Sequence, residues 1–126
     1  MSPFKGQTGL KRILNAGGYS LAGLQAAFSG EAAFRQLVLL SVVLIPLAFF
    51  FEVSRGERAV MIAACLLALI VELLNSAIEA AIDRISLDLH PLSKNAKDMG
   101  SAAVLLALLL CGGIWVAAIA QRIFHG

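Results

Sequence analysis

The sequence predicts an all-α membrane protein in which an N-terminal amphipathic surface helix is followed by three transmembrane helices. This fold class follows from the composition, from three long apolar runs and from the distribution of lysine and arginine. Of the 126 residues, 60% are hydrophobic and only 14% are charged, whereas a soluble domain is about half apolar and a quarter charged. The length is enough for a single domain, residues 1–126. The net charge of +2 indicates no nucleic-acid partner.

The first predicted element is an amphipathic helix over about residues 5–30. Apolar residues recur there at helical spacing, and the polar residues fall elsewhere on the helical wheel. Such a helix lies on a membrane surface with its cations toward the lipid headgroups. The adjacent residues Gly17 and Gly18 mark the point at which it would divide into two pieces. The apolar positions are Leu10, Ile13, Leu14, Gly17, Leu21, Leu24 and Phe28.

Three apolar runs predict spans over about residues 34–51, 59–83 and 100–121. The first, QLVLLSVVLIPLAFFF, is uncharged but short, and it contains Pro46. The third, residues 100–120, has 21 residues. It rises by about 31 Å as a helix, which matches the hydrocarbon thickness of a bilayer. The connection before it holds His90 and Pro91, so a turn is expected there.

Lysine and arginine predict the orientation in the membrane. With three spans, the N-terminal part and the connection after the second span lie on one side and carry seven of these residues, and the other side carries three. We therefore expect a multi-pass protein of the cytoplasmic membrane, with its N-terminus in the cytoplasm and its C-terminus outside. The seven are Lys5, Lys11, Arg12, Arg35, Arg84, Lys94 and Lys97, and the three are Arg55, Arg58 and Arg122.

The second apolar run continues into VELLNSAIEAAIDR, residues 71–84, which carries an unusual set of polar groups. Glu72, Asn75, Glu79 and Asp83 fall within about 80° on a helix and form what we call the acid stripe. The acid stripe cannot face lipid, so it faces protein, water or a bound cation. Glu72 lies about 16 Å deeper than Asp83 along the helix axis. A deep acid suits a general base, and shallower carboxylates suit a hard divalent cation.

Structural explanations remain open for several of these residues. Asn75 and Ser76 fit interhelical packing as well as they fit a site. Arg12 fits a headgroup anchor and His90 a solvated loop residue. Glu31 fits an i,i+4 pair with Arg35. Asp98 or Ser101 fits a cap for the third spanning helix. The two cysteines, Cys65 and Cys111, fit packing inside apolar runs.

The sequence contains neither the phosphate-binding GxxxxGK[ST] motif nor the HRD and DFG motifs, so a soluble kinase fold is not expected. Three blocks, however, closely resemble the bacterial membrane diacylglycerol kinases, a family unrelated to soluble kinases. They are EAAFRQ (31–36), VELLNSAIEAAIDR (71–84) and AKDMGSAAVL (96–105). The resemblance covers nearly the whole chain, from Gly18 to the third span.

The resemblance implies an enzyme of the bacterial inner membrane that transfers the γ-phosphate of ATP, with Mg²⁺ as cofactor, to the hydroxyl of 1,2-diacylglycerol. The product would be phosphatidic acid, and the enzyme would be a homotrimer with shared active sites. Glu72 would be the catalytic base, and Glu31 and Glu79 would bind the metal. The implied ATP-binding residues are Arg12, Tyr19, Glu31, Glu79, His90, Lys97 and Asp98. Those near the lipid substrate are Arg12, Ser20, Phe34, Glu72 and Ser101, with Asn75 and Asp83 in supporting positions.

Two alternative functions remain. A sister branch of the family phosphorylates undecaprenol with a similar acid motif, although AFRQ and KDMGSAA look more like the diacylglycerol branch. A small oligomeric proton or cation pathway would also explain acids in a span. Compared with better-known members of the family, this sequence has Gln25, Phe28 and Leu37 where Arg, Trp and an acid can occur. These differences concern the lipid-facing region rather than the phosphate chemistry.

Overall fold

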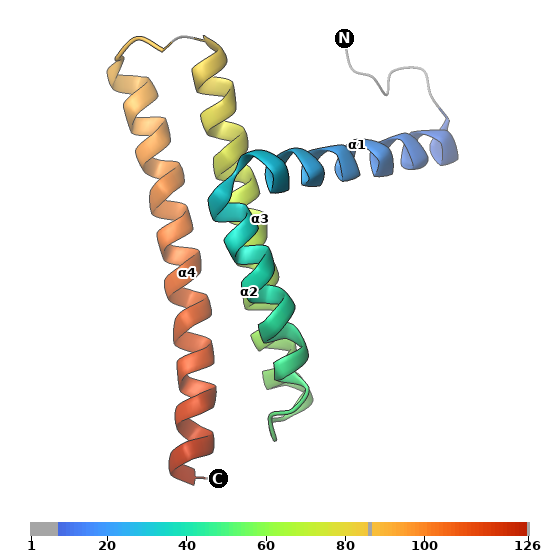
Figure 1. The fold of residues 1–126 in the computed structure, drawn as a ribbon, viewed down its shortest axis with the longest axis vertical. Helices are drawn as coiled ribbons and strands as arrows, with labels where there is room; N and C mark the ends of the chain where they lie inside the picture. Colours follow the sequence, from blue (N-terminus) through green and yellow to red (C-terminus); the bar gives the residue numbers. More distant parts are fainter. Residues whose placement is uncertain (1–7, 86, 126) are drawn as a thin grey trace.

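The computed structural model describes residues 8–85 and 87–125, and in this part of the chain it has four α-helices and no strand. They are α1 (Gly9–Gly30), α2 (Ala32–Ala48), α3 (Arg55–Ile85) and α4 (Pro91–His125). Helix α3 packs against both α2 and α4, while α1 projects sideways from the bundle (Figure 1). The predicted all-α fold is confirmed.

Helices α3 and α4 are each long and apolar enough to cross a membrane. The number of spans among the described residues rises to three if α1 and α2, which meet at a bend of 105°, are counted as one broken span. Helix α2 has 17 residues and ends at Ala48, within the predicted span over residues 34–51. The 31 residues of α3 extend about 46 Å, which exceeds the roughly 30 Å of a hydrocarbon core.

Helix α1 is continuous from Gly9 to Gly30, so the expected break at Gly17 and Gly18 does not occur. Residues 5–7 of the predicted surface helix lie outside the described residues. Only Ala27 of α1 is buried, and apolar residues such as Leu10 and Leu14 are exposed in the single chain.

A single residue, Glu31, forms the joint between α1 and α2. Its backbone is extended, with φ −120° and ψ 107°, and it therefore interrupts the helix. The guanidinium of Arg35, from the first turn of α2, donates hydrogen bonds to the carbonyl oxygens of Phe28 at 2.7 Å and Ser29 at 3.1 Å. These carbonyls lack helical partners because α1 has ended. Arg35 therefore stabilises the bend by capping α1 from the next helix.

Another arginine, Arg58, caps backbone carbonyls at the C-terminal end of α2. Arg58 donates from Nε to the carbonyl of Ala48 and from Nη2 to the carbonyl of Phe51, each at 3.1 Å. Helix α3 starts beside this cap, and the Ser54 hydroxyl accepts a hydrogen bond from the backbone N–H of Glu57 at 3.1 Å. Ser and Glu at this spacing are the capping-box pattern of a helix start.

The predicted turn at His90 and Pro91 is confirmed, because α4 begins at Pro91. Pro91 occupies the first helical position, where its missing N–H has no consequence. Nδ1 of His90 accepts a hydrogen bond from the N–H of Leu92 at 3.1 Å. Helix α4 thus starts well before Gly100. Asp98 and Ser101 lie in its interior, so the structural alternative in which one of them caps the helix is wrong.

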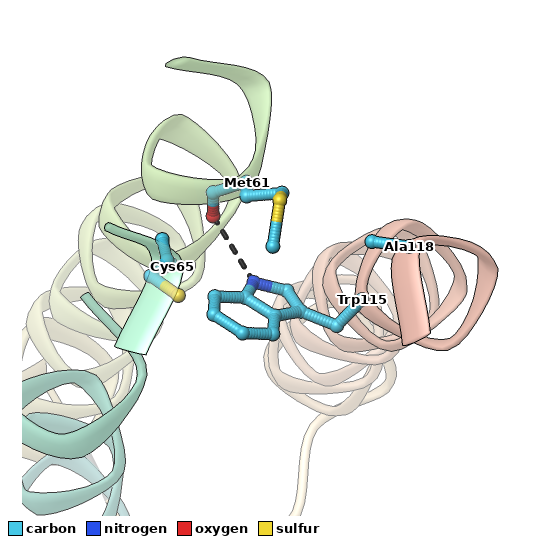
Figure 2. Close-up of a cluster of buried hydrophobic side chains, with 5 residues drawn as sticks. Met61, Cys65, Trp115 and Ala118 are labelled. Atoms are coloured by element: carbon cyan, nitrogen blue, oxygen red, sulfur yellow. Dashed lines mark hydrogen bonds between the residues drawn. The ribbon is translucent and has the colours of Figure 1, made fainter. Parts of the chain in front are cut away.

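Buried apolar side chains join α2, α3 and α4 at the end of the bundle farthest from the α3–α4 turn. Trp115 of α4 donates a hydrogen bond from Nε1 to the carbonyl oxygen of Met61 on α3, at 3.1 Å (Figure 2). Its ring also meets Phe51 edge-on, with 5.9 Å between the ring centroids. Cys65 and Ala118 are buried in the same cluster. Both cysteines are free thiols, as their apolar surroundings predicted.

Candidate active site

The acid stripe lies along α3, and its exposure rises toward the α3–α4 turn. Glu72 is 6% exposed and Asn75 is 9% exposed, as is the neighbouring Ser76. Glu79 is half-buried and Asp83 is exposed. The deep end of the stripe therefore faces protein, as expected for polar groups that cannot face lipid, while its shallow end reaches solvent.

Asn75 connects the deep and shallow parts of the acid stripe. Its side-chain nitrogen Nδ2 donates a hydrogen bond to Oε1 of Glu79 at 3.3 Å. Its oxygen Oδ1 is buried and finds no hydrogen-bond partner among the described residues. That oxygen lies against Gly100 of α4. The amide is therefore fixed between two helices, with its nitrogen toward the Glu79 carboxylate.

Glu31 lies beside this stripe, at the joint of α1 and α2. It lines a groove of about 530 Å³, here called the α1–α3 groove, together with Ser20, Gly23, Leu24, Ala26, Ala27, Leu73, Ser76, Ala77 and Ala80. Leu73 and Ser76, which lie between Glu72 and Glu79 on α3, line the same groove as Glu31. The structure thus brings the three predicted acids into one neighbourhood. The alternative pair of Glu31 with Arg35 is wrong, because no described ion pair joins them and Arg35 binds backbone carbonyls instead.

A second hollow, lined mostly by polar and charged residues, lies at the α3–α4 turn and is called the turn pocket. It has a volume of about 210 Å³ and is lined by Ile82, Asp83, Leu87, Asp88, Leu89, His90, Ser93, Lys94, Lys97 and Asp98. Its lining residues form two ion pairs. Nζ of Lys97 contacts Asp83 at 2.7 Å, and Nζ of Lys94 contacts Asp98 at 2.6 Å. Both pairs are largely exposed, so a polyanionic ligand can compete for the ammonium groups.

An apolar groove of about 630 Å³ runs between α1, α2 and α3. Its lining is Leu21, Leu24, Gln25, Phe28, Ser29, Phe34, Val38, Leu66, Leu69, Ile70 and Leu73. Leu24 and Leu73 also line the α1–α3 groove, so the two hollows adjoin. Phe34, a predicted lipid-contact residue, lines this groove and is 3% exposed. The groove has the apolar character that an acyl chain requires.

Six predicted site residues do not line these hollows within one chain. Three of them, Glu72, Asn75 and Glu79, lie on α3 beside residues that do. The other three lie on α1 and α4. Arg12 and Tyr19 lie on exposed parts of α1, and Ser101 is exposed on α4. None of them lines the α1–α3 groove, the turn pocket or the apolar groove.

The residues present fit a divalent cation that is bound together with a phosphate ligand. No group of three or more His, Cys, Asp or Glu side chains able to hold a metal occurs within the described ranges. Mg²⁺, however, is usually held by one or two carboxylates together with substrate phosphates rather than by an all-protein cage. Glu79, which accepts a hydrogen bond from Asn75, and Glu31 are two partly exposed carboxylates that would suit such a site.

Sequence reasoning missed three residues that shape the site. Lys94 pairs with Asp98 in the turn pocket, and its i,i+4 spacing was a usable signal. Arg35 was assigned to the wrong partner, because the carbonyls it caps come from the preceding helix. Gly100 gave no signal, since its contact with Asn75 depends on how α3 and α4 pack.

Comparison with known proteins agrees with the resemblance. A family model described as prokaryotic diacylglycerol kinase matches residues 18–119. A diacylglycerol kinase of Pseudomonas aeruginosa is 78% identical over 114 residues, which cover 90% of this chain and 93% of that protein. A diacylglycerol kinase of Escherichia coli K12 is 50% identical over 111 residues (86% of this chain and 88% of that protein). One from Haemophilus influenzae is 47% identical over 108 residues (86% and 92%). Because these matches span most of the chain, it belongs to the prokaryotic diacylglycerol kinase family.

Proposed function

We propose that this chain is a lipid kinase that transfers the γ-phosphate of ATP to the free hydroxyl of 1,2-diacylglycerol, releasing ADP and phosphatidic acid. The observation that carries the proposal is the course of the acid stripe. It runs from the buried Glu72 through Asn75 and Glu79 to the exposed Asp83. The apolar groove is lined by Leu73, which follows Glu72 at the deep end, and the charged turn pocket is lined by Asp83 at the shallow end. A kinase that joins a membrane-dissolved alcohol to a water-dissolved nucleotide needs both environments at one site.

Glu72 is the proposed general base. Its carboxylate accepts the proton of the lipid hydroxyl as the oxygen forms a bond to the γ-phosphorus. The bond between that phosphorus and the oxygen bridging to the β-phosphate breaks, and ADP leaves with the electron pair. Burial of Glu72 keeps bulk water from competing for the proton and for the phosphate. Such reactions depend mostly on positioning and on neutralising phosphate charge.

Glu79 and Glu31 are the proposed metal ligands. Mg²⁺, when bound with ATP, supplies charge neutralisation at the phosphates. Asn75 holds the Glu79 carboxylate by one oxygen, which leaves the other free for this task. Lys97 and Asp98 in the turn pocket, with His90 beside them, would contact the nucleotide.

The apolar groove is the proposed binding site for the acyl chains of the lipid. It lies directly beside the α1–α3 groove, so a lipid bound there would present its headgroup toward Glu31 and Ser20. Phe34 and Phe28 both line the apolar groove, and Phe28 is the more exposed of the two. Substitution at Phe28 is therefore expected to change acyl preference more than turnover.

The working form is proposed to be a homotrimer in the bacterial inner membrane, with the N-terminus in the cytoplasm. Two observations support this assembly and orientation. Six predicted site residues line none of the three hollows of a single chain, as expected if sites are shared between subunits; they are Arg12, Tyr19, Glu72, Asn75, Glu79 and Ser101. Lysine and arginine gather on the side that carries α1 and the α3–α4 turn.

The test uses purified protein in mixed micelles with labelled MgATP. Transfer of label to diacylglycerol, but not to undecaprenol, is the expected result. Preferential labelling of undecaprenol would assign the chain to the sister activity instead. Absence of transfer to either lipid, together with cation flux through protein-containing vesicles, would favour the pathway alternative. Cross-linking in native membranes should give trimers, and fully active monomers would refute the shared site.

A further inference from the structure

Helices α3 and α4 approach closely at Gly100. The three heavy atoms nearest to a Cβ atom placed on Gly100 all belong to Asn75 and lie within 4 Å of it. It would overlap Oδ1, press on Cγ at 3.2 Å and touch Cβ at 3.9 Å. Every other glycine in the described part of the chain has no such atom within 4 Å. The missing side chain of Gly100 therefore accommodates one specific group, the amide of Asn75.

The orientation of that amide is set by Glu79. An ionised carboxylate only accepts hydrogen bonds, so the nitrogen of Asn75 must face Glu79 and the oxygen must face the opposite way. The opposite side is the backbone of Gly100. Oδ1 remains without a hydrogen-bond partner there, among the described residues, although Asn75 is only 9% exposed. An unpaired buried acceptor is unfavourable, so the packing at Gly100 must hold it.

We propose that Gly100 is a positioning residue for phosphate transfer. By lacking a Cβ it admits Oδ1 of Asn75, which keeps Nδ2 on the Glu79 carboxylate and fixes that carboxylate for the metal–nucleotide complex. This inference rests on the metal role that the proposed function gives to Glu79.

The same close approach connects the two halves of the site. Gly100 follows Lys97 by less than one helical turn on α4, and Lys97 pairs with Asp83 on α3 at 2.7 Å. Asn75 and Asp83 both belong to the acid stripe. The distance between α3 and α4 at Gly100 therefore also determines whether Lys97 can reach its partner.

The experiment is a double-mutant cycle in the full-length protein, with the Mg²⁺ concentration for half-maximal activity as one measurement and thermal stability in micelles as the other. Gly100→Ala and Asn75→Ala should each raise the half-maximal Mg²⁺ concentration by about tenfold, the order expected when a carboxylate loses an orienting hydrogen bond. The double variant should be no worse than either single variant. Gly113→Ala, at a glycine of the same helix with open space around it, is the matched control and should behave as wild type.

Thermal stability tests the contact without any catalytic assumption. Gly100→Ala should melt at a lower temperature than wild type, and the double variant should recover, because Asn75→Ala leaves only the Cβ at 3.9 Å, an ordinary contact. If Gly100→Ala alone does not fold, the double variant should still fold and behave as Asn75→Ala. A double variant that is as unstable as Gly100→Ala, or effects on Mg²⁺ dependence that simply multiply, would overturn the proposal.

The variant Glu79→Gln tests the proposed metal role independently of Gly100. It therefore shows whether a negative result counts against the positioning role or against the proposed function. If Glu79→Gln shifts the Mg²⁺ dependence but Gly100→Ala and Asn75→Ala do not, the positioning role is refuted and the proposed function stands. If Glu79→Gln also leaves the Mg²⁺ dependence unchanged, the metal role has failed and the role of Gly100 falls with it.

Discussion

Replacing Glu72 by glutamine is the sharpest test of the mechanism. Gln has nearly the same volume as Glu and retains hydrogen-bonding capacity, so the 6%-exposed site should keep its packing. What it loses is the oxygen that accepts a proton. General-base catalysis contributes about 10²- to 10⁴-fold in rate, which is a rise of about 2.7–5.5 kcal/mol in the activation free energy. We expect kcat to fall within that range.

The other properties of the variant should change little. Nucleotide binding is assigned to the shallow end of the acid stripe and to the turn pocket, both nearer the aqueous phase than Glu72. The affinity for ATP should therefore stay within about twofold of wild type. Stability should be equal or higher, because a buried ionisable group has been removed.

The assay measures phosphate transfer, nucleotide binding and thermal unfolding on one preparation. Glu57→Gln is a suitable control, since Glu57 lies in the first turn of the same helix at its opposite end. Turnover of Glu72→Gln within a few fold of wild type would show that Glu72 is not the base. Loss of folding or of ATP binding would show that its role is structural.

Three further outcomes are expected. Glu79→Gln should lose most activity at ordinary Mg²⁺ and regain part of it as Mg²⁺ is raised; an unchanged Mg²⁺ titration would contradict the metal role. Asp83→Asn should lower the KM for ATP by up to about fivefold with kcat unchanged, because it removes an exposed ion pair worth about 0.2–1 kcal/mol that competes with the phosphates for Lys97, and steady-state kinetics would measure this. Trp115→Phe should lower the unfolding free energy by about 1 kcal/mol through loss of the hydrogen bond to Met61, while leaving the KM for ATP unchanged. Denaturant titration in micelles would check the stability effect.

The parts of the fold that were predicted correctly depend on local sequence. The acid stripe is a matter of helical spacing within 12 residues, and the turn at Pro91 follows from the chemistry of proline. Neither the acid stripe nor this turn depends on contacts with a neighbouring helix.

The parts that were missed depend on packing between segments. Arg35 and Arg58 cap backbone carbonyls that precede them in sequence. These contacts form only where the chain bends between two helices, so helical spacing did not predict them. Asp98 was expected near a helix start because the apolar run begins at Gly100, whereas α4 extends as a polar helix back to Pro91. Hydropathy marks where a helix enters lipid and says little about where the helix itself begins.

The position of Glu31 at the bend has a mechanical consequence. Helix α1 has 22 residues and is about 33 Å long. A 10° swing of α1 about its joint would move its far end by roughly 6 Å but would scarcely displace the backbone of Glu31, because that residue is the pivot. Arg35 holds the last carbonyls of α1 close to the same point. A tilt of α1 would thus move its N-terminal end far more than the backbone of Glu31, which lies beside α3.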